Sequence, residues 1–260
     1  MSETACYLYA IAAPVGDDVV GGLRGVADEP VRLVRHRDLA AVVGTVDVGP
    51  DGAFGEERLA RNLADLAWLE TAARAHHAVV AGVAGAAPVA PLRLGTIVDD
   101  DDAVRGRLDR WHDGFRSALE EVAGRAEWSV KVYAPQPVEP RPDAEPAPGA
   151  PGAGAAYLTR RKAAASARGD AFAHATAVAG QVHEELARQA ADARRLAAQD
   201  QRLTGHDTPM CLNGAYLVPF DGADAFAATV EALRDRHPDC RFELAGPWPA
   251  YSFVTVEEES

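Results

Sequence analysis

The segment PQPVEPRPDAEPAPGAP, residues 135–151, is the strongest break in composition along this 260-residue chain. It contains seven prolines in 17 residues. Because proline fixes φ and lacks a backbone N–H, neither a helix nor a sheet can run through the segment, and a semi-rigid linker or long surface loop is expected. We therefore predict an N-terminal domain at 1–135, a Pro/Gly/Ala-rich linker at 136–156 and a C-terminal domain at 157–260.

Upstream of this break, the hydrophobic pattern alternates between strand-like and helix-like periods. Strands are predicted at 5–11, 30–36, 39–46 and 127–133, with an extended stretch at 88–98. After Gly55 the period changes to 3.6, which predicts a helix to about residue 80 with His77 on its buried face; a second helix follows the acidic run at 99–102. This order contains a ferredoxin-like unit plus an extra helix and strand.

Downstream of the break, an alanine- and arginine-rich helix is predicted from about residue 157 to 201. A strand at 210–220, a helix and the strands CRFELAG (240–246) and YSFVTVE (251–257) follow, which is a β-α-β-β sheet packed with a long helix. The same order begins the first domain, which suggests a duplicated half-ferredoxin unit. The predicted class is α+β, with two domains.

The net charge argues against two classes of binding partner, and the cysteine content indicates a cellular compartment. The formal charge of −13 argues against nucleic acid and against anionic membranes as partners, because both require a basic face. Three scattered cysteines without a CxxC pair favour a reducing cytosol. The N-terminus has no basic region of the kind found in signal peptides, so we expect a cytoplasmic protein.

Motifs for chemistry are weak, so we predict no catalytic, cofactor-binding or metal-binding residues. HEELA at 183–187 has alanine where a zinc-protease helix has its second histidine, and no P-loop or nucleophile elbow occurs. Arg93, in APLRLGTIV, is expected either in a structural ion pair or in a partner contact. In ELAGPWPAYSFV (243–254), Trp248 and Tyr251 are expected either to close the end of the core or to face a partner.

Eight short segments follow one another along the chain: YLYAI, LAAVVG, HHAVV, PVAPLRLGTIV, EWSVKVY, AYLTRRKA, NGAYLV and GPWPAYSFV. Taken in this order, they resemble the gas vesicle F/L accessory proteins, with departures at Leu94 and Ala250. The resemblance implies a modified ferredoxin-like first domain and a non-enzymatic, gas vesicle associated assembly protein without cofactors. It also implies binding to the small hydrophobic major shell protein, which would limit aggregation of that protein during vesicle formation, and contacts with other small gas vesicle accessory proteins. Arg93, Trp248 and Tyr251 are the candidate interface residues. The alternative is a small-molecule-binding or enzymatic ferredoxin-like protein.

Overall fold

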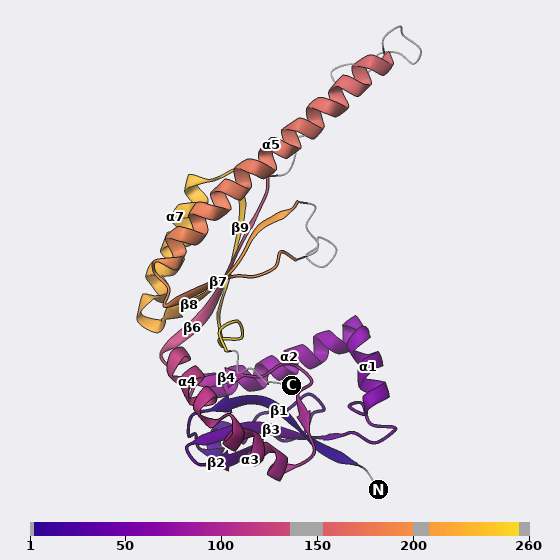
Figure 1. The fold of residues 1–260 in the computed structure, drawn as a ribbon, viewed down its shortest axis with the longest axis vertical. Coiled ribbons are helices and arrows are strands. Elements are labelled where there is room, and N and C mark those ends of the chain that lie inside the picture. Colours follow the sequence, from indigo (N-terminus) through magenta and orange to yellow (C-terminus); the bar gives the residue numbers. More distant parts are fainter. Residues whose placement is uncertain (1–2, 136–152, 200–207, 255–260) are drawn as a thin grey trace. The chain divides into compact units, whose positions relative to one another are not determined.

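The computed structural model describes residues 3–135, 153–199 and 208–254, and its chain divides into two compact units. The N-terminal unit comprises Met1–Glu127 together with Pro247–Ser260, and the central unit comprises Trp128–Gly246. Figure 1 shows the elements of both units along the chain. Each unit contains an antiparallel sheet with helices, so the predicted α+β class is confirmed.

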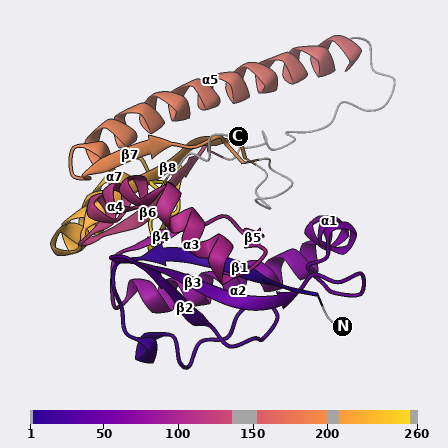
Figure 2. The same cartoon turned by 60° about the horizontal axis from the view of Figure 1, so that its bottom comes forward.

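The N-terminal unit has a five-stranded sheet. Its strands are β1 (Thr4–Ala12), β2 (Arg32–His36), β3 (Leu39–Asp47), β4 (Val89–Pro91) and β5 (Ile97–Val98). The order is β2-β3-β1-β4, with β5 also paired to β1. Figure 2 shows β1, β2 and β3 side by side. The predicted hairpin is present, since β2 and β3 pair in register from Arg32 opposite Val43 to His36 opposite Leu39.

Strand β1 is buried on both faces, and its alternating side chains supply two cores. Tyr7 and Tyr9 pack with residues of α2 (Leu66–Ala84), such as Val79. Leu8 packs on the other side with residues of α3 (Asp101–Arg110) and α4 (His112–Val122). The sheet is therefore covered by helices on both faces, as its continuous apolar strands require.

The long helix predicted after Gly55 is two helices, α1 (Glu56–Ala64) and α2. Asp65 separates them in extended conformation, and its carboxylate accepts hydrogen bonds from the first amides of α2. This break changes the helical phase, so His76 is the buried histidine of α2 and His77, the predicted one, is half-buried. Leu66, the first residue of α2, is 73% exposed.

The central unit repeats the strand order of the N-terminal unit. Its elements are β6 (Arg125–Tyr133), α5 (Ala153–Ala187), β7 (Asp192–Arg195), β8 (Met210–Pro219), η2 (Phe220–Gly222), α7 (Ala223–Arg236) and β9 (Arg241–Trp248). The sheet order is β7-β8-β6-β9. Numbered from its own first strand this is 2-3-1-4, the same order as β2-β3-β1-β4, and both are the order of a β-α-β-β-α-β ferredoxin-like unit. In the N-terminal unit the short 3-10 helix η1 (Asp17–Val19) occupies the place of the first helix.

Three sequence-based expectations for this half of the chain differ from the structure. The strand predicted to close the first domain is β6, an inner strand of the central sheet. The long helix ends at Ala187, and residues 192–195 pair with β8 as a strand. The last predicted strand does not form over its described residues, because Tyr251–Phe253 make a turn. Unit boundaries accordingly fall within β6 and β9, whereas most of the predicted linker, residues 136–152, lies outside the described residues.

Candidate interaction surface

The end of β9 and the segment after it place two of the three predicted interface residues on the surface of the N-terminal unit. Pro249 and Ala250 begin a tight turn in which the amide of Tyr251 donates to the Pro249 carbonyl at 2.8 Å and the amide of Phe253 to the Ala250 carbonyl at 3.2 Å. Ala250 and Phe253 are buried and anchor the turn, whereas Trp248 and Tyr251 are 40% and 38% exposed. The segment therefore has an inner anchor and an outer aromatic face.

His77 of α2 lies against both of these aromatic residues. Its ring centroid is 5.2 Å from that of Trp248, edge to face, and 6.0 Å from that of Tyr251. The Tyr251 hydroxyl and His77 Nδ1 are 3.2 Å apart. Because burial raises the pKa of Tyr251, the phenol stays protonated. Its O–H donates a hydrogen bond to His77 Nδ1 when the imidazole proton is on Nε2. We call Trp248, Tyr251 and His77 the aromatic cluster.

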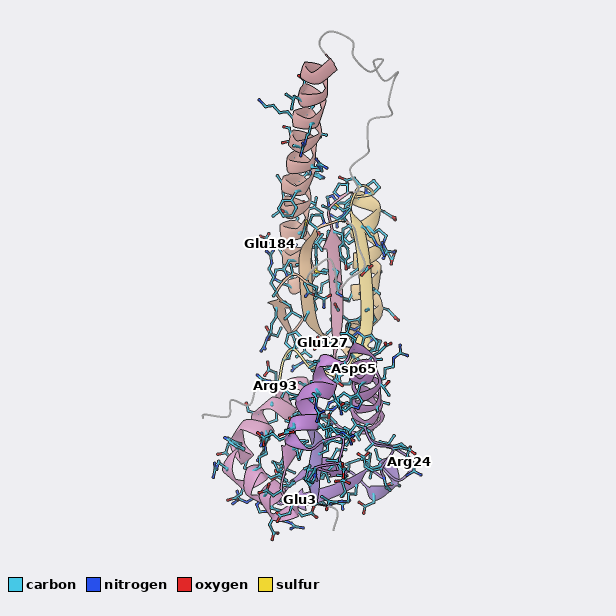
Figure 3. The ribbon with its side chains drawn as sticks, turned by 90° about the vertical axis from the view of Figure 1, so that its right-hand side faces the viewer. Glu3, Arg24, Asp65, Arg93, Glu127 and Glu184 are labelled. Atoms are coloured by element: carbon cyan, nitrogen blue, oxygen red, sulfur yellow. The ribbon has the colours of Figure 1, made fainter. Side chains whose placement is uncertain are left out.

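A buried carboxylate fixes the same segment at the residue that follows Tyr251. Glu127, at the start of β6, is buried, and its two oxygens accept from the Ser252 amide at 2.7 Å and from the Ser252 hydroxyl at 2.6 Å. Hydrogen bonds to a charged acceptor are stronger than neutral ones. The turn is thus held to the N-terminal unit by both apolar and polar contacts. Figure 3 marks Glu127 and the third predicted residue, Arg93.

Arg93 lies in the loop between β4 and β5, which the other histidine of α2 helps to fix. The Tyr7 hydroxyl accepts from the Gly95 amide at 3.0 Å and donates to His76 Nδ1 at 3.0 Å. Gly95 has a φ of +83°, a conformation that glycine adopts without strain. Burial lowers the pKa of His76 to about 4, so the ring is neutral at physiological pH. Of its two ring nitrogens, Nδ1 is the one that is hydrogen-bonded, to Tyr7.

The structure thus distinguishes the three predicted residues. Trp248 and Tyr251 come together at His77, whereas the Arg93 side chain is exposed and makes no ion pair with any residue in the described part of the chain. The structural ion pair expected for Arg93 is therefore not found there. His77 was not predicted as a member of the cluster, although the adjacent pair His76 and His77 is a signal in the sequence: on one helix the two rings point in different directions, one inward and one toward the surface.

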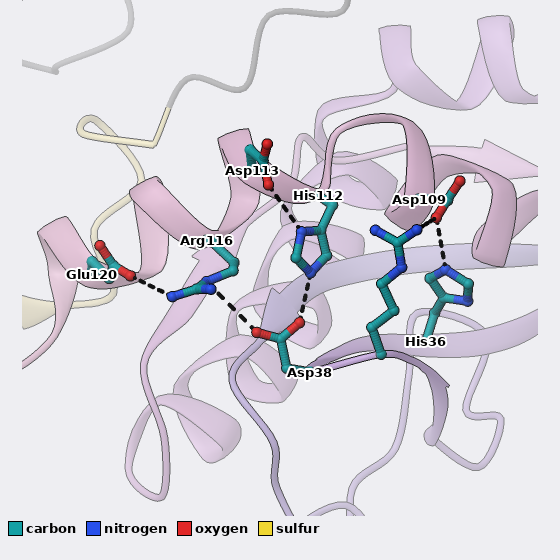
Figure 4. A network of polar contacts seen from close by, with 8 residues as sticks. His36, Asp38, Asp109, His112, Asp113, Arg116 and Glu120 are labelled. Carbon is teal, nitrogen blue, oxygen red and sulfur yellow. Dashed lines mark hydrogen bonds and ion pairs between the residues drawn. The ribbon is translucent and has the colours of Figure 1, made fainter.

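A separate cluster of charged residues joins the β2–β3 turn to α3 and α4 (Figure 4). Asp38 accepts from His112 at 2.6 Å and lies 3.6 Å from the Arg116 guanidinium, while Asp109 contacts His36 and Arg37. The hydrogen bond to Asp38 raises the pKa of His112, and the same contact lowers the pKa of Asp38. The carboxylates and guanidinium groups are about half exposed and the two histidines are more buried, so the cluster holds the β2–β3 turn against the two helices with modest energy.

Among the residues that the structure describes, no helix is both long enough and apolar enough to cross a lipid bilayer.

Comparison with known proteins first establishes the fold class. The crystal structure of the gas vesicle protein GvpF from Anabaena sp. PCC7120 aligns with a TM-score of 0.67 at 17% identity and covers 98% of each chain. GvpF from Microcystis aeruginosa aligns with a TM-score of 0.65, over 97% of this chain and 99% of that one. The chain therefore has the α+β fold of these proteins.

Sequence similarity identifies the family. The family model described as gas vesicle synthesis protein GvpL/GvpF matches residues 5–255. Gas vesicle protein L of Streptomyces sp. (strain CB03234) is 41% identical, over 97% of this chain and 94% of its own length. Gas vesicle protein F of the same strain is 27% identical, over 95% of this chain and 98% of its own length. The chain belongs to the GvpL/GvpF family, which confirms the resemblance seen in the sequence.

Proposed function

We propose that this gas vesicle accessory protein binds the small, hydrophobic major shell protein and limits its aggregation while the vesicle forms, without catalysing a reaction. The observation that carries the proposal is the family match over residues 5–255, together with 41% identity to a gas vesicle protein L. Association with the vesicle and with other small gas vesicle proteins is part of the same proposal.

The physical need for such a protein follows from the nature of a shell subunit. A small amphipathic subunit exposes apolar faces and unpaired strand edges before assembly, and both promote aggregation. A partner with a formal charge of −13 would keep the complex soluble through electrostatic repulsion between complexes.

Strand addition to the N-terminal sheet is disfavoured by the chemistry of both edges. At the β2 edge, Arg32 and Arg35 form ion pairs with Asp101 and Asp17. At the other edge β4 has only three residues and ends in Pro91, which has no amide to donate. Charged residues, short strands and prolines protect sheet edges against pairing. We therefore favour contact through side chains on the surface of the unit.

The aromatic cluster suits such a contact. Trp248 and Tyr251 are partly exposed yet held in fixed positions by His77, so little side-chain entropy is lost when a partner covers them. Tryptophan and tyrosine are enriched among the residues that dominate binding energy. Arg93 is an exposed cation on a loop tied down by Tyr7, and we include it as a flanking contact in the proposed interface.

Co-expression tests this proposal. The shell protein is produced with the full-length chain, with Trp248→Ala, with Tyr251→Ala or with Arg93→Ala, and its soluble fraction and co-purification are measured. Phe220→Ala is the matched control, because Phe220 is an aromatic residue of the central unit with 62% exposure. We expect the aromatic variants to lose co-purification at least tenfold while Phe220→Ala retains it. Unchanged shell-protein solubility with and without the wild-type chain refutes the function, and retained binding by both aromatic variants refutes the proposed surface alone.

A further inference from the structure

Three metal-ligating side chains from distant parts of the sequence meet in the central unit. They are His174 on α5 and Asp239 and Cys240 in the connection between α7 and β9. One ligand atom from each lies within 4.8 Å of the other two. His174 Nε2 and an Asp239 carboxylate oxygen are 3.0 Å apart.

The fold positions each of these groups firmly. His174 precedes Ala175, which is fully buried and fixes this turn of α5 in the core of the unit. After α7 ends, the Cys240 amide donates to the His237 carbonyl at 3.0 Å, which closes the turn containing Asp239. Cys240 itself is 5% exposed and packs in the same core, whereas Asp239 and His174 are exposed. The thiol thus forms the inner wall of the cluster and the other two ligands form its outer rim.

The donor set selects a class of cation. One imidazole nitrogen, one thiol sulfur and one carboxylate oxygen match the ligands of zinc and of related borderline-soft ions, whereas magnesium and calcium prefer oxygen ligands alone. An exposed histidine–aspartate pair and a buried cysteine are each common by themselves. Their convergence is what distinguishes this place from an ordinary surface ion pair.

We propose that His174, Asp239 and Cys240 bind a divalent cation of the zinc class, with water in the fourth position of a tetrahedral site. Zinc bonds of about 2.0–2.1 Å to nitrogen or oxygen and about 2.3 Å to sulfur imply ligand separations of about 3.3–3.6 Å. The observed 3.0 Å contact and the 4.8 Å limit bracket these values, so side-chain adjustments of about 1 Å complete the site. Binding converts the thiol to a zinc-bound thiolate, and the displaced proton goes to solvent.

A cation here would join α5 to the α7–β9 connection. Because the site exists only in the folded unit, cation binding would stabilise the central unit against unfolding. The site belongs to the central unit and the aromatic cluster to the N-terminal unit, and the proposal of a cation site does not depend on shell-protein binding.

Calorimetry on the full-length, tag-free chain tests the site. With thiols kept reduced, zinc chloride is titrated into the wild type and into His174→Ala, Asp239→Asn and Cys240→Ser, and cobalt(II) absorption reports whether sulfur is a ligand. Controls are His237→Ala and Asp235→Asn, which remove the same residue types close by in sequence. Thermal melts without metal verify that each variant is folded. His174→Ala and Asp239→Asn remove exposed side chains and should fold, so these two variants still test the site if Cys240→Ser does not fold.

We expect one zinc ion per chain and a loss of affinity of at least tenfold in each ligand variant, with both controls unchanged. Cobalt(II) should show a sulfur-to-metal charge-transfer band in the wild type that is absent from folded Cys240→Ser. The proposal is overturned if the wild type binds no zinc, or if folded His174→Ala and Asp239→Asn bind it as tightly as the two controls do.

Discussion

Replacing His76 by asparagine should remove a large part of the acid sensitivity of the N-terminal unit. The His76 ring is 4% exposed, and its Nδ1 accepts a hydrogen bond from Tyr7 at 3.0 Å. The oxygen of an asparagine side chain can take the place of Nδ1 as the acceptor, so His76→Asn keeps the partner of Tyr7 and removes only the titrating group.

The sign and size of the effect follow from the shifted pKa. Burial lowers the pKa of His76 to about 4, below the ordinary value of 6.5. Above pH 6.5 the ring is neutral in both folded and unfolded chains, whereas below that value the unfolded chain binds the proton more readily and folding is disfavoured. At about 1.4 kcal/mol per pKa unit, the full loss is about 3.4 kcal/mol below pH 4, and about 2 kcal/mol is already lost between pH 7.5 and 5.

Urea unfolding at pH 7.5 and at pH 5 measures this loss, with hydrogen exchange of peptides from α2 and β1 as the probe of the N-terminal unit alone. We expect the wild type to lose about 2 kcal/mol more than His76→Asn between the two values. Comparing differences between pH values cancels any direct cost of the substitution and the titration of other groups. His77→Asn is the matched control, because it makes the same substitution on the same helix and leaves the contact between His76 and Tyr7 in place. Equal pH dependence of wild type and His76→Asn would refute a buried neutral ring at this position.

Three smaller perturbations test other contacts. Asp65→Ala removes the cap of two α2 amides and should lower the free energy of unfolding by about 1 kcal/mol in urea titrations, with no change if the cap is irrelevant. Ser252→Ala removes the 2.6 Å hydrogen bond from the Ser252 hydroxyl to the buried Glu127 carboxylate. This substitution should lower the free energy of unfolding by about 1.5–3 kcal/mol and speed hydrogen exchange in the segment after β9. Unaltered exchange would contradict the role of this hydrogen bond as an anchor. Asp38→Asn should lower the raised pKa of His112 toward its ordinary value in an NMR titration. A histidine whose pKa is raised in the folded state stabilises the fold at low pH, and this stabilisation is lost as the pH rises through the pKa of the folded state. The stability of Asp38→Asn should therefore fall less than that of the wild type as the pH rises through this range.

Most helices and strands of the N-terminal unit were predictable because each has a clear hydrophobic period. The phase of α2 was not, because the cap formed by Asp65 ends one helix and begins another within a continuous helical pattern. β7 was also missed: its sequence DARR has the composition of the helix before it, and pairing with β8 makes it a strand. In both places a specific hydrogen-bonding contact outweighs the pattern of side chains.

The candidate surface was predictable in part. The prolines on either side of Trp248 indicated a rigid segment, and Trp248 and Tyr251 both lie against His77. The partner residue His77 was not predictable, because it lies in a helix far away in the sequence and the helical phase had been assigned differently. The alternation of Tyr251 with Phe253 is typical of a strand, yet hydrogen bonds to the Pro249 and Ala250 carbonyls close a turn instead.

The proline-rich segment, most of which lies outside the described residues, is where we predicted a boundary between domains. Its seven prolines predict neither helix nor sheet, and from them we inferred a linker between two domains. In the structure, β6 before the segment and α5 after it belong to the same central unit. The segment therefore lies within the first β-α connection of that unit, and the repeated β-α-β-β-α-β unit begins before it, at β6. The repeat therefore aligns β1 with β6 and not with β8, and in each sheet the fourth strand, β4 or β9, pairs with the first. Long insertions in surface connections add little to the entropy cost of folding, so a ferredoxin-like unit can accommodate this segment without losing its strand order.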